Sequence, residues 1–520
     1  MITRNIKTIF RSLKSDFNCD RHFFMFVAII TIFYGLAFVF ADFYGMPCEG
    51  MADYVQLFKY WLLIEMGVFG LFLLLSLQKW VFAVCFPLIT FACTVMTYYR
   101  YTVKAVLTPQ VIDLVLVNDM RTSMHAISWQ LVVCCLISLL LSYFVVRYRW
   151  KKISVRLWYL WIVVALLFIY YPNSRGHLST EVEQRMPYSI YYSIDEYLRT
   201  KQKIDEERKM FENKATAKSD SITVVFIIGE SLRADHLQMN GYIRETTPML
   251  LKEPNVVSLP NVRTDFTLTH LSIPHFMTRS SDDNPERAYH ERSFISLFKQ
   301  AGFHTSWLAN QESGDTYVYF MKEADTLSYV NSSKSMYLFD SWLDGDILPI
   351  YDDILGKSSR QLIVMHTVGS HWFYNSHFTK EFCRYTPTAD SRVINGNSVE
   401  RMVNSYDNTI LYSDWFWHEV IDRLRSKNAV IIYLSDHGES LGEDGYFTHG
   451  VDREEQHSVA SWIWYSDRFA EKYPEKVDAL KKNKDKKMKT YFLFHSIIDA
   501  GDLKWADKES EKSVFTAPVV

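Results

Sequence analysis

Residues 429–440 carry the sequence AVIIYLSDHGES, which decides the fold of the C-terminal half of the chain. The first six residues form a continuous apolar run, which is typical of a parallel strand buried on both faces. Asp436 and His437 follow where this strand gives way to a loop. A carboxylate and an imidazole at a strand end can bind one divalent cation, although most isolated Asp-His pairs are surface or capping residues.

A second strand end lies far upstream. Residues 222–228 read ITVVFII, another continuous apolar run, and Gly229, Glu230 and Ser231 follow it. Ligands of open α/β sheets gather at the carboxyl ends of the strands, so Glu230 and Asp436 are expected to share one cation. The alternative for Glu230 is a charge in the first turn of a helix that starts near Ser231.

The C-terminal part of the chain alternates short apolar runs with helical stretches. Further strands are expected at 304–308, 361–366 and 461–465. This alternation predicts an α/β domain, residues 221–520, with a mostly parallel central sheet covered on both faces. A formal net charge of -3 lacks the basic footprint of a nucleic-acid-binding protein, so no nucleic-acid partner is expected.

The N-terminal third has the composition of a membrane domain. About 20 apolar residues are needed for a helix to cross the hydrocarbon core. Five segments meet this requirement and predict a five-span domain at 1–172; they are residues 23–41, 58–77, 81–98, 131–146 and 157–171.

Basic residues set the expected orientation, because Lys and Arg accumulate in cytoplasmic segments. They cluster before the first span, in the second connection and in the fourth connection; they are Arg4, Lys7, Arg11, Lys14, Arg21, Lys79, Arg147, Arg149, Lys151, Lys152 and Arg156. With five spans, all of these lie on one side if the N-terminus is cytoplasmic. The C-terminal domain is then expected outside the cytoplasm.

Residues 173–220 are expected to connect the two domains. Residues 186–194 are aromatic, which is typical of a segment at the membrane interface, with an ordinary surface helix as the alternative. Residues 195–218 are densely charged and predict a solvated helical linker.

Cysteine positions argue against a disulfide-stapled external domain. Of the seven cysteines, only Cys48 and Cys383 are expected to face outward, and only Cys383 lies in the C-terminal domain. A single thiol cannot form an internal bridge, although an exported compartment would permit one.

Several motifs together resemble the membrane phosphoethanolamine transferases of Gram-negative bacteria, which belong to the alkaline phosphatase and sulfatase superfamily. The matching stretches are residues 229–235, 240–242, 245–248, 310–311, 405–412 and 435–443. The resemblance covers nearly the whole chain. It implies a multi-pass α-helical membrane domain followed by an alkaline-phosphatase-like α/β domain.

The resemblance also implies a threonine nucleophile at the head of a helix. The family's spacing selects Thr269, bound to zinc together with Glu230, Asp436 and His437. Coordination to a metal can stabilise the alkoxide of a hydroxyl that is otherwise a poor nucleophile. One tightly bound Zn²⁺ is expected, and a second during turnover is left open. Without the family, Thr269 would be interpreted as a helix-capping residue.

Further residues match family positions that contact the substrate. His371 and His449 correspond to histidines that contact the transferring phosphoryl group or a second metal, and either could protonate the leaving alkoxide. Asn118 and Thr122 have the spacing of residues that bind the lipid headgroup. Packed, structural roles are expected for the remaining notable histidines, which are His270, His275, His366 and His457.

The reaction implied by the resemblance is a two-step transfer of phosphoethanolamine. Thr269 attacks the phosphorus of phosphatidylethanolamine, diacylglycerol leaves, and an acceptor takes the group from the phospho-threonine. The acceptor is expected to be lipid A, a sugar of the lipopolysaccharide core or a periplasmic glycan. The implied protein is a multi-pass, monomeric inner-membrane enzyme with a periplasmic catalytic domain.

One departure from the family bears on the acceptor. Asp265 and His275 stand where many lipid A-modifying relatives have cysteines flanking the nucleophile. The chain therefore resembles the disulfide-poor members, whose acceptors also include core sugars and glycans.

Three rival functions are open at this stage. A sulfatase needs Cys or Ser in a Cys/Ser-x-Pro-x-Arg context, and residues 272–276, SIPHF, lack the arginine. A phosphoglycerol transferase would use phosphatidylglycerol with the same metal and threonine. A catalytically inactive relative would bind lipid and regulate envelope synthesis, but it would be expected to lose metal ligands that are present here.

Overall fold

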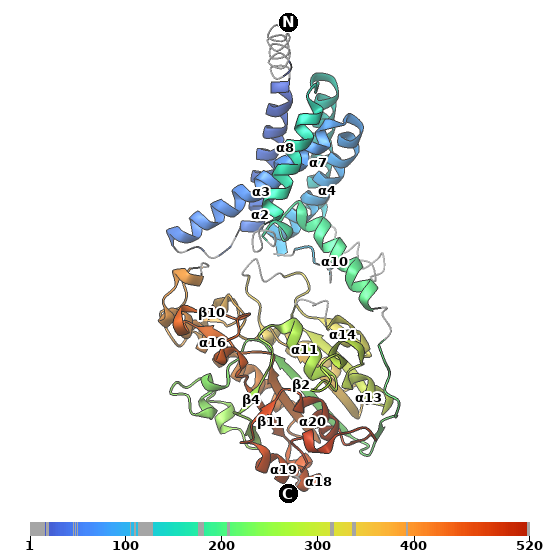
Figure 1. The fold of residues 1–520 in the computed structure, drawn as a ribbon, viewed down its shortest axis with the longest axis vertical. Coiled ribbons are helices and arrows are strands. Elements are labelled where there is room, and N and C mark those ends of the chain that lie inside the picture. Colours follow the sequence, from blue (N-terminus) through green and yellow to red (C-terminus); the bar gives the residue numbers. More distant parts are fainter. Residues whose placement is uncertain are drawn as a thin grey trace. The chain divides into compact units, whose positions relative to one another are not determined.

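The computed structural model describes residues 16, 20–44, 46, 48, 50–103, 106–108, 111–112, 128–174, 181–204, 208–311, 317–334, 340–391 and 394–516. The chain forms two compact units. The membrane unit comprises residues 1–198 with 333–340, and the unit expected from the sequence to be catalytic, the catalytic unit, comprises 199–332 with 341–520. Both are drawn in Figure 1.

Four helices of the membrane unit are long and apolar enough to cross a bilayer. They are Asp20–Phe43, α3 (Met51–Leu77), α4 (Lys79–Val103) and α7 (Trp129–Lys152). The fifth predicted span corresponds to α8 (Trp158–Asn173), which is shorter than the other four. The basic residues expected in the fourth connection partly belong to the last turns of α7, because this helix continues to Lys152.

Close helix packing in the membrane unit depends on a small residue. Gly70 of α3 faces α8, where an added Cβ would lie 2.8 Å from the carbonyl oxygen of Ala165. The C-terminal end of α3 is closed by Arg149 of α7, whose guanidinium is buried and donates to the carbonyl oxygen of Ser76 at 2.8 Å. After the span helices, α10 (Tyr188–Ile204) carries the aromatic segment and part of the charged linker.

The catalytic unit is built on a seven-stranded sheet with the order β3-β11-β8-β2-β7-β5-β6. β8, β2, β7, β5 and β6 run parallel, whereas β11 is antiparallel to both of its neighbours. The strands are β2 (Ile222–Gly229), β3 (Val256–Ser258), β5 (His304–Ala309), β6 (Thr326–Tyr329), β7 (Arg360–His366), β8 (Ala429–Ser435) and β11 (Ser461–Tyr465). Small two-stranded sheets pair β1 (Thr216–Ala217) with β13 (Leu503–Lys504), β4 (Val262–Arg263) with β12 (Met488–Lys489), and β9 (Ser440–Leu441) with β10 (Phe447–Thr448).

Helices surround this sheet (Figure 1). They are α11 (Thr269–Met277), α12 (Arg287–His290), α13 (Phe294–Gln300), α14 (Val318–Glu323), α15 (Leu348–Ile354), α16 (Val399–Asp422), α17 (Glu454–His457), α18 (Asp467–Lys472), α19 (Pro474–Asn483) and α20 (Phe492–Ala500). Phe226 of β2 packs against Phe276 of α11 and Phe294 of α13, with ring centroids 5.9 Å apart in each pair. Trp417 of α16 packs against Tyr433 of β8. The side chain of Tyr433 points to the opposite face of the sheet from that of Phe226.

The fold class predicted from the sequence is confirmed: a helical membrane unit precedes an α/β domain with a mostly parallel sheet. The five predicted strands all exist with bounds within one residue. The sheet is mixed, however, because β11 runs antiparallel to β8. The short strands β3 and β6 were not predicted.

Candidate active site

The two predicted strand ends lie side by side. Gly229 of β2 pairs with Ser435 of the neighbouring strand β8, and the backbone N–H of Asp436 donates to the carbonyl oxygen of Gly229 at 3.1 Å. Glu230 directly follows Gly229, and Asp436 directly follows Ser435. Both acidic residues therefore lie at the same edge of the sheet. Gly229 has no room for a side chain, because a Cβ would collide with the hydroxyl of Tyr433.

Thr269 reaches the same point from another element. It is the first residue of α11, and its hydroxyl makes no capping bond to the helix backbone because Leu268 is the N-cap residue. Instead, Thr269 Oγ1 donates to Glu230 Oε2 at 3.1 Å and lies 3.2 Å from His437 Nε2. The hydroxyl thus faces the predicted metal ligands, at the N-terminal end of a helix whose first backbone N–H groups favour an anion.

The donor set fits a divalent cation such as zinc. One ligand atom each from Glu230, Asp436 and His437 can be chosen so that all three lie within 4.8 Å of one another. His437 Nδ1 donates to the carbonyl oxygen of Gly438 at 2.9 Å, which leaves the lone pair of Nε2 directed at the site. Asp436 Oδ2 is buried without a hydrogen-bond partner among the described residues, although Oδ1 accepts two backbone N–H bonds. A bound cation would satisfy this oxygen.

Electrostatics at the site also favour a cation. Burial, followed by the charge of Asp436, raises the pKa of Glu230 well above its usual value. Burial likewise raises the pKa of Asp436. Burial and the neighbouring charge of His449 lower the pKa of His437 to about 3, so this imidazole is neutral at physiological pH. Two adjacent buried carboxyl groups and one neutral imidazole are groups whose charged or lone-pair forms a metal ion stabilises.

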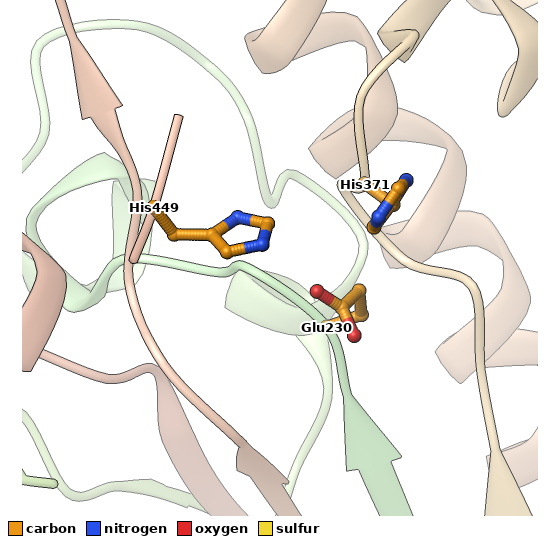
Figure 2. Close-up of side chains that lie close together, drawn as sticks. All are labelled: Glu230, His371 and His449. Atoms are coloured by element: carbon orange, nitrogen blue, oxygen red, sulfur yellow. The ribbon is translucent and has the colours of Figure 1, made fainter. Parts of the chain in front are cut away.

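The two histidines assigned to the substrate lie next to these groups. Figure 2 shows the side chains of Glu230, His371 and His449 converging from three segments. The ring centroid of His449 is 4.3 Å from that of His437 and 6.0 Å from that of His371. Glu230, His371 and His449 also offer ligand atoms within 4.8 Å of one another, which is a second candidate cation position.

Opposite protonation states distinguish these two histidines. Burial lowers the pKa of His449, but the Glu439 carboxylate, which lies 2.9 Å from His449 Nδ1, outweighs this and raises the pKa to about 9. Burial and the charge of His449 hold the pKa of His371 well below its usual value. At neutral pH the site therefore contains a cationic His449 that can donate a proton and a neutral His371 that can accept one.

Two residues of the site were not predicted from the sequence. Glu439 is fully buried and also accepts a bond of 2.7 Å from the hydroxyl of Tyr374. Gln311 donates to Glu230 Oε2 at 3.1 Å. Glu439 lies in the stretch 435–443 and Gln311 in the stretch 310–311, both of which carry the family resemblance. Their place in these motifs is the feature of the sequence that could have identified them as site residues.

Other predicted residues lie away from this cluster or outside the described residues. Asn118 and Thr122 belong to the part of the chain that the structure does not describe. His366 is packed as expected, 1 % exposed between Trp307 and Tyr317. The outcomes for the other three histidines differ. His275 and His457 donate to backbone carbonyl oxygens, whereas His270 was wrongly expected to be packed and is exposed on α11.

Residues 222–503 match the family described as Sulfatase. The chain belongs to this family. The match begins with β2 and ends within β13, so it covers the sheet and every residue of the cluster around Thr269.

Two kinds of relatives extend the comparison. The chain is 34% identical over 294 residues to Kdo(2)-lipid A phosphoethanolamine 7''-transferase of Escherichia coli (strain K12). This match covers 54% of the chain and 51% of the relative, so the chain spans about half the length of the curated relative it matches. The soluble domain of lipooligosaccharide phosphoethanolamine transferase A from Neisseria meningitidis is 26% identical, with a TM-score of 0.54 over 60% of this chain and 98% of that one.

The similarity of fold extends beyond the catalytic unit. The integral membrane form of the Neisseria meningitidis protein has a TM-score of 0.54, with 22% identity over 94% of this chain and 98% of that chain. At this identity the likeness shows the fold alone. It supports the combination of a helical membrane unit with a Sulfatase-family domain in one chain.

The hydroxyl of Ser272 does not lie where a nucleophile of this site would need to be, beside the predicted metal ligands. It lies one turn after Thr269 on α11 and is 1 % exposed. Its hydroxyl lies 3.4 Å from Thr264 Oγ1 and donates to the carbonyl oxygen of Phe266, also at 3.4 Å. Among the described residues, the hydroxyl that contacts Glu230 and His437 is that of Thr269.

Proposed function

We propose that the chain is a zinc-dependent phosphoethanolamine transferase that takes its group from phosphatidylethanolamine. The observation that carries this proposal is the position of Thr269 Oγ1, 3.1 Å from Glu230 Oε2 and 3.2 Å from His437 Nε2 at the start of α11. The similarity to a Kdo(2)-lipid A phosphoethanolamine transferase supports the choice of transferred group. Glu230, Asp436, His437 and Thr269 would hold one zinc ion, which when bound supplies positive charge that stabilises the threonine alkoxide.

In the first half-reaction, the deprotonated Oγ1 of Thr269, whose proton has passed to solvent, forms a bond to phosphorus, and the bond from phosphorus to the diacylglycerol oxygen breaks. The leaving oxygen takes up a proton, and His449 is the group able to give one because it is protonated at neutral pH. Backbone N–H groups at the start of α11 can donate to the phosphoryl oxygens. Phosphoethanolamine is left on the threonine, and neutral diacylglycerol remains in the membrane.

In the second half-reaction, an acceptor oxygen attacks the same phosphorus and Thr269 leaves. His371, neutral at physiological pH, can take the proton of an acceptor hydroxyl. Lipid A or a sugar of the lipopolysaccharide core is proposed as the acceptor, with a periplasmic glycan as the other member of this class. The span helices anchor the enzyme in the membrane that contains the donor lipid. The catalytic unit is proposed to face the periplasm and to act as a monomer.

The proposal is tested by the intact mass of the zinc-loaded, full-length protein after incubation with lipid. Phosphatidylethanolamine should add a phosphoethanolamine group to the wild type but not to a Thr269→Ala variant, with release of diacylglycerol. A Ser272→Ala variant is the matched control, because this hydroxyl lies on the same helix away from the ligands, and it should still form the adduct. A phosphoglycerol adduct from phosphatidylglycerol would assign the protein to the rival transferases. Absence of both adduct and diacylglycerol in the zinc-bound protein would favour a lipid-binding regulator.

A further inference from the structure

A groove lies between the first membrane helix, Asp20–Phe43, and α7. One part has a volume of about 620 Å³ and is lined by residues of both helices, including Phe26, Ile29 and Val145. A second part has a volume of about 440 Å³ and adds residues of α4, including Phe86. The two parts share Ile29, Ile30 and Val145, so they form one continuous groove.

The groove is long, and the part of it that includes residues of α4 is apolar. From Cys134 to Lys152 it follows α7 for 19 residues, a rise of about 27 Å along an α-helix. This length approaches the hydrocarbon thickness of a bilayer, about 30 Å. The hydroxyls of Thr90 and Thr94 donate to carbonyl oxygens one turn earlier in α4, so these side chains do not make the wall polar. Such a surface suits an acyl chain.

One end of the groove is positively charged. Arg147, Lys151 and Lys152 of α7 line it together with His22 of the first helix, and all four side chains are exposed. Among the described residues, no carboxylate forms an ion pair with Arg147, Lys151 or Lys152. Neighbouring arginines differ, because Arg149 is buried against backbone carbonyl oxygens and Arg156 pairs with Asp16 at 3.1 Å. Unpaired cations at the mouth of an apolar groove match the chemistry of an anionic lipid.

We propose that this groove binds an anionic glycerophospholipid, with the phosphate at the basic end and an acyl chain along the helices. A zwitterionic lipid fits less well, because its own ammonium group offsets the attraction of the phosphate to the basic side chains. The N-terminal residues 1–15 are also a poor occupant, because they carry Arg4, Lys7, Arg11 and Lys14 and no acidic residue. The site is independent of the transferase reaction and lies wholly within the membrane unit.

A general excess of Lys and Arg on the cytoplasmic side accounts for basic residues near helix ends without any specific site. Lys79 is the internal control for this explanation. It begins α4 among the basic residues assigned to the same side of the membrane, but it does not line the groove. A specific site requires Lys151 and Lys152 to matter for lipid binding and Lys79 not to matter.

The test is native mass spectrometry of the full-length protein with phosphatidylglycerol or phosphatidylethanolamine added at equal concentrations. Phosphatidylglycerol should be retained to higher collision energy. Each basic side chain near an anionic lipid contributes about fivefold to affinity, so the combined change Arg147→Gln, Lys151→Gln and Lys152→Gln should weaken binding of phosphatidylglycerol about a hundredfold. Binding of phosphatidylethanolamine should change little, and Lys79→Gln should behave as the wild type.

Two further measurements separate a groove from a simple anion site. Ile29→Trp places a larger side chain where the two parts of the groove meet, and it should reduce retention of phosphatidylglycerol while the basic residues are intact. Glycerol 3-phosphate, which has no acyl chain, should bind far more weakly than the lipid. Equal retention of the two lipids, an equal loss in Lys79→Gln, or equal binding of glycerol 3-phosphate would each overturn the proposal.

Discussion

At the scale of single residues, the site is an arrangement of buried charges that is unfavourable without a cation. Glu230 and Asp436 are adjacent, and burial raises the pKa of both carboxyl groups. Among the described residues, Asp436 Oδ2 has no hydrogen-bond partner, but it lies 3.3 Å from His437 Nε2. Ligand binding stabilises a fold by mass action, so the contribution of Asp436 to stability should depend on metal.

Asp436→Asn should therefore have effects of opposite sign with and without zinc. The amide oxygen can keep the two bonds donated by the backbone N–H groups of Ser231 and His437, and the new amide N–H can donate to His437 Nε2. In chelator, the variant should unfold at a higher temperature than the wild type, because the repulsion with Glu230 is gone. In excess zinc the order should reverse. A lower unfolding temperature of the variant under both conditions would contradict this account.

Glu439 gives a second prediction at this scale. Its carboxylate lies 2.9 Å from His449 Nδ1 and holds that ring in place beside His437. A general acid typically contributes about 10²- to 10⁴-fold to a rate, so Glu439→Gln, which removes the carboxylate that keeps His449 protonated, should lower the transfer rate by up to that factor while the zinc content stays near one per chain. Glu454→Gln, which removes an exposed partner of Arg263, is the matched control and should leave the rate unchanged. An unchanged rate in Glu439→Gln would remove His449 from the proposed chemistry.

The sequence predicts some members of this site and not others for a local reason. Glu230, Asp436 and His437 each follow a continuous apolar strand, so their position at the sheet edge is visible in a short window. Glu439 acts through His449, ten residues later, and through Tyr374 in a different part of the chain. Such a contact exists only after the chain has folded, and composition or periodicity does not indicate it.

At the scale of elements, burial on both faces determines what can be predicted. The central strands β2 and β8 are continuous apolar runs, and their predicted bounds agree with the structure to within one residue. The edge strands β3 and β6 read VVS and TLSY, and most of their residues are only partly buried. They carry no apolar run that separates them from a loop. The antiparallel direction of β11 depends on the connection that leads into it, which leaves no mark within its own five residues.

Contacts between helices are predicted to make stability depend on pH. Glu323 ends α14 and accepts bonds from the backbone N–H and the hydroxyl of Ser293, the N-cap residue of α13. Burial raises the pKa of Glu323 to about 7. The folded state thus holds this proton more tightly than the unfolded state, and stability is lost as pH rises from about 4.5 to about 7.

Glu323→Gln should remove this dependence, because the amide cannot ionise but can still accept from Ser293. Thermal unfolding of the full-length protein at pH 5 and pH 8 measures the effect. The wild type should lose stability relative to the variant across this interval, by up to about 3 kcal/mol. Parallel curves for the two proteins would show that Glu323 does not titrate in this window.

At the scale of the whole molecule, the number of membrane crossings fixes the side on which the catalytic unit lies. The helix α8 is 16 residues long, or about 24 Å, compared with a hydrocarbon thickness of about 30 Å. Exposed aromatic side chains occupy both of its ends, Trp158 and Tyr159 at the start and Tyr170 and Tyr171 near the finish. Aromatic residues favour the two interfaces of a bilayer, and a short span is accommodated by local thinning at modest cost. From these features we predict a fifth crossing, which would place the catalytic unit on the side of the membrane opposite the N-terminus.

Two exposed positions that flank α8 test the fifth crossing directly. In a variant without its seven native cysteines, Lys152→Cys and Ser174→Cys are introduced separately, and right-side-out vesicles are treated with a membrane-impermeant maleimide. If α8 crosses the membrane, Ser174→Cys should react in intact vesicles, and Lys152→Cys only after the vesicles are opened. Equal reactivity of both positions would mean that α8 lies along one surface. An even number of crossings would then place the catalytic unit on the cytoplasmic side, away from the acceptors proposed for it.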